Sequence, residues 1–246
     1  MSPQTRIATP VASVGIFLAL GATCAHAFCL QPQPIRVCAE FFKADEVFTG
    51  TIISAQYMED HIPEPYPDPQ PGWHYRLKVL KNFRGPARGT VDVYTENTSG
   101  RFPLDLDKSY LLFAYKSGSI LQVYGCLNSV ELTDAGTALA EIRRLLSDAG
   151  GNADGSIRGC VVNRSGGVPL GGISLTARSS KRKFLTQTGP DGWFDLRVPP
   201  GKYNVAGSAT GWTVTPYDVS FDDPSAVKIE SGGCADVQFG ATRNSR

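Results

Sequence analysis

A cluster of acidic residues around a histidine is the part of this sequence best suited to chemistry. It lies between residues 57 and 72, a stretch with five prolines that fits neither a helix nor a strand. Its members are Glu59, Asp60, His61, Glu64 and Asp68. Carboxylates suit hard cations and a histidine suits zinc, so these residues are candidate metal ligands. A solvated acidic loop is the commoner meaning of this composition, so we predict no bound metal.

The sequence contains no motif that pairs a nucleophile with a general base. After residue 27 the only other histidine is His74, and neither histidine lies in a zinc-protease helix motif or beside a nucleophile elbow. We therefore predict no catalytic residue and no cofactor, and we expect a protein that binds rather than an enzyme.

Aromatic side chains in the second half of the chain are further candidates for ligand contact. Trp193 and Trp212 carry flat faces able to stack on sugar rings, and Tyr203 and Tyr217 are close to them in sequence. The competing interpretation is that these rings belong to a β-structured core. Trp193 and Phe194 cannot both point inward on one strand, because successive side chains alternate.

The first 27 residues have the order of a secretory signal peptide. Arg6 precedes a ten-residue apolar run, Val11 to Leu20, and Ala25-His26-Ala27 places small residues before the expected cleavage. The run is too short to span a bilayer, and no later stretch is apolar enough to do so. We expect a mature chain beginning at Phe28, secreted or periplasmic, and not spanning a membrane.

Five cysteines follow the expected cleavage. They are Cys29, Cys38, Cys126, Cys160 and Cys234. An exported chain meets an oxidising compartment, so disulfides are the default, and an odd number leaves one thiol unpaired or paired between chains. The absence of any C-x-x-C motif argues against redox chemistry.

Composition favours an all-β chain without affinity for nucleic acid. Residues 28–246 carry 23 basic and 23 acidic side chains, a balance that gives no long-range attraction to a polyanion. Lys181-Arg182-Lys183 is interpreted as a solvated hairpin tip. Glycine and proline are plentiful, which is typical of many short strands joined by turns.

Apolar alternation in the first half predicts a small barrel. Strands are expected at residues 47–55, 73–80, 90–95, 109–115 and 120–124, and helices at 39–45 and 132–146. Thr133 is the expected N-cap of the second helix. Five short strands with a closing helix predict a five-stranded barrel of the OB type.

Short motifs along residues 28–149 carry a resemblance to a known family. They are Cys29…Cys38, Ala44-Asp45-x-Val47-Phe48-x-Gly50, Phe83-Arg84-Gly85, Tyr110-Leu111-Leu112-Phe113-Ala114 and Gly125-Cys126. Their order resembles the netrin-like OB-fold domain of tissue inhibitors of metalloproteinases. In that family the mature chain begins with a cysteine whose amine and carbonyl chelate the catalytic zinc of the protease.

The resemblance implies disulfides and a contact surface for this chain. It implies a Cys29–Cys126 disulfide, and it leaves Cys38 as the odd thiol unless Cys38 reaches Cys160. Here the expected mature chain begins with Phe28 and not with a cysteine, so it lacks the family's chelating N-terminal residue. The implied partner contacts lie in the N-terminal segment Phe28–Cys38, in the first strand and in the loop at 57–72. The contact candidates are Phe28, Cys29, His61, Glu64 and Tyr66.

The second half is predicted to be a separate β-sandwich. A glycine-rich linker at 150–156 precedes residues 157–241. Within them, apolar runs recur at 157–162, 173–177, 184–188, 193–198, 203–208 and 237–239, separated by turn signals. That spacing is typical of a sandwich of two antiparallel sheets.

A second resemblance covers nearly all of this region. Its motifs are Gly159-x-Val161, Gly167-Val168-Pro169-Leu170-Gly171-Gly172-Ile173, Thr188-x-x-Asp191-Gly192-x-Phe194 and Pro200-Gly201-x-Tyr203. They resemble the carboxypeptidase-regulatory-like domain, a transthyretin-like, seven-stranded Greek-key sandwich grouped with carbohydrate-binding-like folds. Such domains are usually accessory modules without chemistry. Cys160 and Cys234 are placed to staple the two ends of this sandwich.

Together these features predict an exported, non-enzymatic protein with two β-domains. The leading expectation is protein–protein interaction through the first domain, in the manner of a metalloprotease inhibitor. The alternative is binding of carbohydrate or cell envelope by the sandwich.

Overall fold

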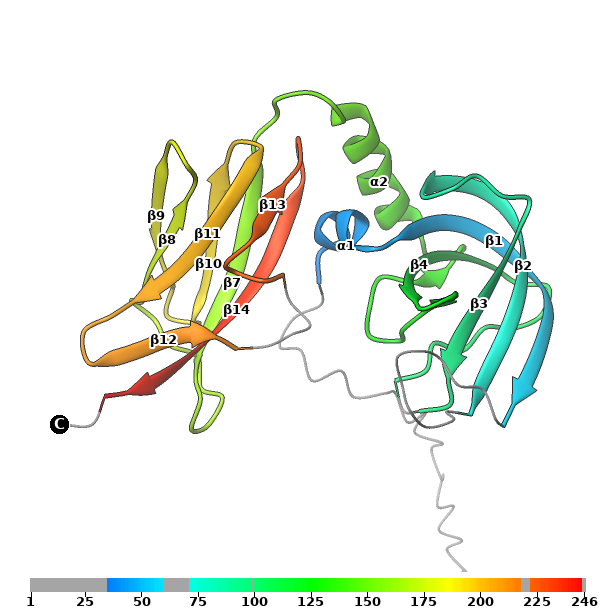
Figure 1. Ribbon diagram of the computed structural model, residues 1–246, viewed down its shortest axis with the longest axis horizontal. Helices are drawn as coiled ribbons and strands as arrows, with labels where there is room; N and C mark the ends of the chain where they lie inside the picture. Colours follow the sequence, from blue (N-terminus) through cyan, green and yellow to red (C-terminus); the bar gives the residue numbers. More distant parts are fainter. Residues whose placement is uncertain (1–34, 60–70, 99, 218–221, 245–246) are drawn as a thin grey trace, which may run out of the picture.

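The computed structural model describes residues 35–59, 71–98, 100–217 and 222–244. Strands dominate, in two bodies that follow one another along the chain (Figure 1). Within these residues no helix is both long and apolar enough to cross a bilayer.

The first body is a closed five-stranded barrel with two helices beside it, as predicted. Its elements are α1 (Val37–Lys43), β1 (Glu46–Met58), β2 (Gly72–Arg84), β3 (Thr90–Glu96), β4 (Ser109–Ser117), β5 (Ile120–Gln122), β6 (Val130–Glu131) and α2 (Gly136–Asp148). The strands pair in the order β1-β2-β3-β5-β4, and β1 also pairs with β4, which closes the ring. The short β6 adds to the outer edge of β4.

Bulges in β1 allow this ring to close. The register with β2 shifts three times, between Val47 and Phe48, between Thr49 and Gly50, and between Ile52 and Ser54. Each extra residue bends the strand and increases its twist. One 13-residue strand therefore pairs with β4 along its first half and with β2 along most of its length.

Helix α2 begins later than predicted. Its N-cap is Ala135, not Thr133, and Ala135 makes no side-chain capping bond. The reason is that the backbone of Leu132 donates to the carbonyl of Ser109, which keeps this segment bound to β4. Ile142 and Leu145 then pack inward against α1.

The second body is a sandwich of two four-stranded sheets. Its strands are β7 (Gly155–Asn163), β8 (Ser174–Arg178), β9 (Lys183–Gln187), β10 (Trp193–Val198), β11 (Gly201–Ser208), β12 (Trp212–Pro216), β13 (Val227–Ile229) and β14 (Cys234–Arg243). One sheet has the order β10-β7-β14-β12 and the other β13-β11-β8-β9. The sandwich therefore has eight strands and not the predicted seven, and none of the predicted apolar runs corresponds to β12 or β13.

The core of the sandwich lies between the two sheets, as alternation requires. Phe194, Leu196 and Val198 of β10 point inward, whereas Trp193 is half-buried on the outer face. Gly159 is needed on β7 because a Cβ there would lie 2.7 Å from the ring of Phe194.

Two cysteine predictions are wrong: that Cys38 is the odd thiol, and that Cys160 pairs with Cys234. Cys38 is bonded to Cys234, with 5.4 Å between their Cα atoms, and Cys160 is a free, buried thiol. In the parallel register of β7 and β14, Cys234 lies beside Ser156 and Cys160 lies beside Gln238. Four residues of strand, about 13 Å, therefore separate the two cysteines of the predicted staple, too far for a disulfide.

The predicted Cys29–Cys126 disulfide has only one of its two cysteines among the described residues. Cys126 is disulfide-bonded, whereas Cys29 lies outside the described residues. The disulfide between Cys38 and Cys234 joins α1 of the first body to β14 of the second, across 196 residues of sequence.

Candidate functional site

The segment from Ile35 to Lys43 binds both bodies at their junction. The main-chain N–H of Arg36 donates to the Asp236 carboxylate at 2.8 Å, and its Nε donates to the same carboxylate at 2.8 Å. Its remaining nitrogens donate to the Ser156 hydroxyl and the Ala235 carbonyl. Asp236 is 2% exposed, so a single arginine anchors the start of α1 to the sandwich through a buried ion pair.

Glu40 fixes the opposite side of α1 to the barrel. Its side chain is fully buried and accepts hydrogen bonds from the main-chain N–H and Nδ2 of Asn128 and from the Tyr115 hydroxyl. Burial raises the pKa of Glu40, and the bonds from Asn128 and Tyr115 oppose that rise without cancelling it. Burial and the nearby Glu40 charge also raise the pKa of Tyr115.

Glu40 is expected to make stability depend on pH. The pKa of Glu40 is higher in the folded state than its ordinary value of 4.5. Folding therefore becomes less favourable as the pH rises from 4.5 through the folded-state pKa. Glu40→Gln does not titrate, and its amide can accept from Asn128 while donating to Tyr115. We expect Glu40→Gln to gain stability relative to wild type over that window, and Glu40→Ala to lose about 3 kcal/mol throughout.

Urea unfolding of the three proteins between about pH 4 and pH 8 measures this effect. Among the described residues, the partly buried Asp222 also has a carboxyl with a raised pKa; it is present in all three proteins and cancels in the comparison. Parallel pH profiles for wild type and Glu40→Gln would contradict the assignment.

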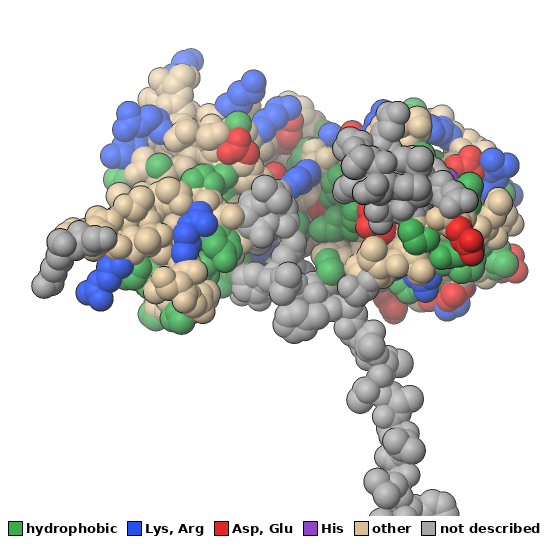
Figure 2. All heavy atoms as spheres, turned by 60° about the horizontal axis from the view of Figure 1, so that its bottom comes forward, with side chains coloured by type: hydrophobic (Ala, Val, Ile, Leu, Met, Phe, Trp, Pro, Cys, Tyr) green, Lys and Arg blue, Asp and Glu red, His purple; other side chains and the backbone are tan. Residues whose placement is uncertain are grey.

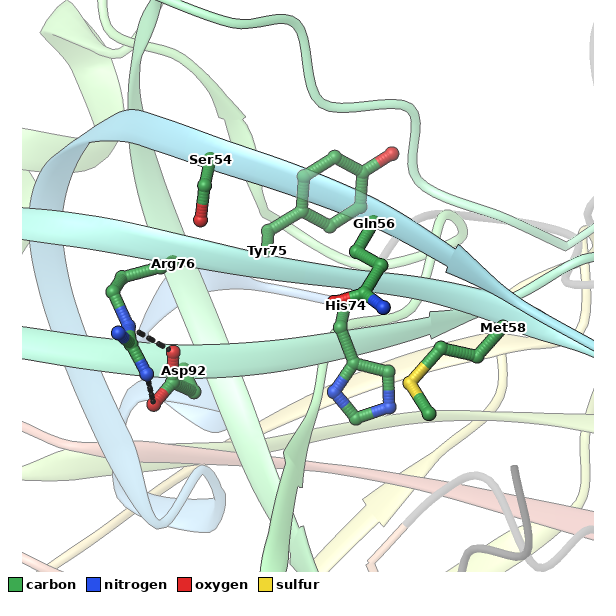
Figure 3. Close-up of a pocket in the computed structure, with 7 residues that line it drawn as sticks. All are labelled: Ser54, Gln56, Met58, His74, Tyr75, Arg76 and Asp92. Atoms are coloured by element: carbon green, nitrogen blue, oxygen red, sulfur yellow. Dashed lines mark hydrogen bonds and ion pairs between the residues drawn. The ribbon is translucent and has the colours of Figure 1, made fainter. Parts of the chain in front are cut away.

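A hollow of about 370 Å³ lies on the outer face of the barrel, over β1, β2 and β3 (Figure 3). Its lining residues are Ser54, Gln56, Met58, His74, Tyr75, Arg76 and Asp92. The bulge at Ile53 creates it, because one extra residue moves the following side chains to the other face of the strand. Figure 3 shows His74 and Arg76 directed to one side of the sheet and Tyr75 to the other.

The groups in this hollow suit polar contact with a partner. Arg76 makes a two-pronged ion pair with Asp92, at 2.8 and 3.1 Å, and the pair raises the pKa of Arg76. Both side chains are more than half exposed, so the pair orients the two groups and adds little stability. His74 packs beside the buried ring of Tyr94, at 5.2 Å between centroids.

An aromatic row occupies the opposite face of the same strands. Tyr57 lies 5.4 Å from Trp73, and Trp73 lies 6.1 Å from Tyr75, between ring centroids. Tyr75 is buried, which raises its pKa, and Tyr57 is 40% exposed. The far end of β1 and β2 therefore presents polar groups on one face and a partly exposed aromatic surface on the other.

A smaller groove, of about 230 Å³, lies on the outer face of the sandwich. Trp193 and Tyr217 both line it, with Asp191, Gln238 and the buried Cys160 among the other residues. Arg158 lies over the Trp193 ring at 5.3 Å, and Arg164 lies over the Tyr217 ring at 4.9 Å. Burial raises the pKa of the Cys160 thiol to about 11, which keeps it protonated and unreactive.

The structure brings together some of the predicted site residues and separates others. Trp193 and Tyr217 share a groove, whereas Trp212 is half-buried against the core of the sandwich. Phe28, Cys29, His61, Glu64 and Tyr66 lie outside the described residues. Among the described residues, no three His, Cys, Asp or Glu side chains gather as metal ligands.

The hollow on the barrel was not predicted from the sequence. The polar–apolar alternation Ser54-Ala55-Gln56 and the opposite charges of Arg76 and Asp92 were the available signals. They become informative only when the register of β1, β2 and β3 is known, because the pairings Ser54–Arg76 and Arg76–Asp92 depend on it.

Comparison of the chain with protein-family models and with curated proteins gave no match.

Proposed function

We propose that this chain is an exported binding protein without enzymatic activity, whose first body contacts a protein partner. The observation that supports this most is the hollow formed by Ser54, Gln56, Met58, His74, Arg76 and Asp92. β1 ends at Met58 and β2 begins at Gly72, so the segment with the contact candidates His61, Glu64 and Tyr66 leaves and returns beside that hollow. Donors, acceptors and a partly exposed aromatic row there provide the mixed chemistry of a protein interface.

The partner class suggested by the resemblance is a metalloprotease. We propose that the loop between β1 and β2, together with the N-terminal segment that includes Phe28 and Cys29, contacts the protease. The disulfide between Cys38 and Cys234 is compatible with an oxidising, extracytoplasmic location.

A panel of secreted metalloproteases assayed with the purified mature protein tests this proposal. We expect inhibition at micromolar concentration or below. The double change Gln56→Arg and His74→Glu should weaken it at least about tenfold, since it alters the centre of the contact. The two new side chains face each other across β1 and β2, so the sheet should keep its stability.

Lys116→Glu is the control, because Lys116 is exposed on β4 and does not line the hollow. No inhibition of any protease at micromolar concentration would reject the inhibitor version. Equally strong inhibition by the double variant would show that the hollow is not part of the contact surface.

Carbohydrate binding by the sandwich is a second candidate, because Trp193 and Tyr217 line one groove with polar neighbours. A glycan array should show a ligand whose binding is lost in Trp193→Ala and Tyr217→Ala. Trp212→Phe is the matched control, since it keeps an aromatic ring against the core and leaves the groove unchanged. Binding that survives both alanine changes would exclude this groove.

A further inference from the structure

The zero net charge of the mature chain conceals an uneven distribution. Residues 28–154 carry 12 basic and 16 acidic side chains, whereas residues 155–246 carry 11 basic and 7 acidic side chains. The sandwich therefore has an excess of four positive charges. Figure 2 shows Lys and Arg side chains gathered along the upper rim of this body.

Six basic residues lie at one end of the sandwich, which we call the cationic end. They are Arg178, Lys181, Arg182, Lys183, Lys202 and Lys228, all exposed. They come from the β8–β9 hairpin, the start of β11 and the short β13, which lie along the upper end of the sandwich in Figure 1. The sequence showed only the run at 181–183, since the other three are distant along the chain.

The strand register places like charges directly opposite each other in this sheet. Arg178 of β8 pairs with Lys183 of β9, and Lys202 of β11 pairs with Lys228 of β13. Like charges in facing positions destabilise a sheet, so these pairs do not serve the fold. Of the six, only Lys228 has an ion pair among the described residues, with Glu230. The positive charge of the cationic end is therefore largely uncompensated.

The cationic end is also hollowed. A depression of about 560 Å³ lies between the β8–β9 turn and the β10–β11 turn, lined by Ser179 to Arg182 and by Pro199 to Tyr203. Both turns are held by hydrogen bonds, since the Ser179 hydroxyl accepts from the backbone of Arg182 and the Tyr203 hydroxyl donates to the Pro199 carbonyl. None of the described residues that line the depression is acidic.

We propose that the cationic end binds an anionic glycan, a polysaccharide chain carrying carboxylate, sulfate or phosphate groups. A concave surface between two fixed turns admits a chain better than it admits a flat membrane. Single-stranded nucleic acid is a poorer fit, because such sites stack bases on exposed aromatic rings, and the one aromatic residue lining the depression, Tyr203, is 4% exposed. Lysine and serine side chains in the depression supply charge and hydrogen bonds for acidic sugars.

This site is separate from the groove of Trp193 and Tyr217 and from the hollow on the barrel, so it does not depend on the proposed function. The test uses heparin and polygalacturonate as sulfated and carboxylated probes, with dextran as the neutral probe. We expect the mature protein to bind both anionic probes and not dextran, with affinity that falls steeply as salt increases.

The deciding variant is Lys183→Glu with Lys202→Glu. Each change turns a like-charge pair into an opposite-charge pair, so the unfolding midpoint should stay level or rise. Affinity for both anionic probes should nevertheless fall at least about tenfold. The control, Lys78→Glu with Lys116→Glu, makes the same change in net charge on the barrel and should leave affinity within about threefold of wild type.

Three results would overturn the proposal. The first is no salt-dependent binding of either anionic probe at about 150 mM salt. The second is an equal loss of affinity in the two double variants, which would indicate a response to net charge alone. The third is tighter binding of duplex DNA or of anionic lipid vesicles than of either glycan, which would assign the cationic end to another class of partner.

Discussion

Replacing both Cys38 and Cys234 by alanine is expected to lower the free energy of unfolding by about 5 kcal/mol. The two cysteines are 196 residues apart in sequence, so their disulfide closes a loop that includes nearly the whole described chain. In the chain-entropy model, a cross-link that closes so long a loop restricts the unfolded chain strongly. Cys234 also packs in the cluster formed by α1 and α2, so the change removes buried contacts as well.

The same change should uncouple the two bodies during unfolding. The disulfide joins α1 to β14, and Arg144 of α2 adds a hydrogen bond to the Gly232 carbonyl. With the disulfide, we expect the barrel and the sandwich to unfold in one transition. Without it, we expect two transitions, which calorimetry and urea unfolding would both detect.

Cys160→Ala is the matched control, because it removes a buried cysteine that forms no disulfide. It should cost about 1 kcal/mol and keep the single transition. Mass spectrometry of the unreduced protein should yield a peptide pair linked through Cys38 and Cys234. A pair linked through Cys160 and Cys234, or a double variant as stable as Cys160→Ala, would contradict this prediction.

The sequence predicted the elements whose side chains alternate regularly and missed those that depend on neighbours. Strand β3 was predicted within one residue, because polar and apolar residues alternate from Thr90 to Val93. Strand β13 is only three residues long, and it exists because its backbone pairs with the start of β11. Val227, Lys228 and Ile229 do alternate, but three residues are too few to predict a strand.

The wrong cysteine pairing has the same kind of cause. Cys160 and Cys234 lie near the two ends of the predicted sandwich, and the prediction paired them for that reason. Their separation is set by the parallel register of β7 and β14, and the choice of Cys38 is set by where α1 docks. Both are properties of assembled elements, as is the meeting of Lys202 with Lys228 at the cationic end.

Asp236 is the second position at which a single change should have a large effect. Its carboxylate is 2% exposed and accepts from Arg36 at 2.8 Å and from Arg158 at 3.3 Å. Both arginines are about one-fifth exposed, so neither is free to replace the lost partner with water. Asp236→Ala removes the buried carboxylate that two partly buried cations share and should lower the free energy of unfolding by about 3–5 kcal/mol.

The chain supplies its own control for this prediction. Asp195 also faces Arg36, but it is 58% exposed and its carboxylate lies 3.8 Å from the guanidinium. Asp195→Ala removes the same charge from the same neighbourhood and should change the free energy of unfolding by about 0.5 kcal/mol or less. Urea unfolding of both variants measures the contrast. Similar losses in the two would mean that net charge near Arg36, and not the buried ion pair, holds the N-terminal segment to the sandwich.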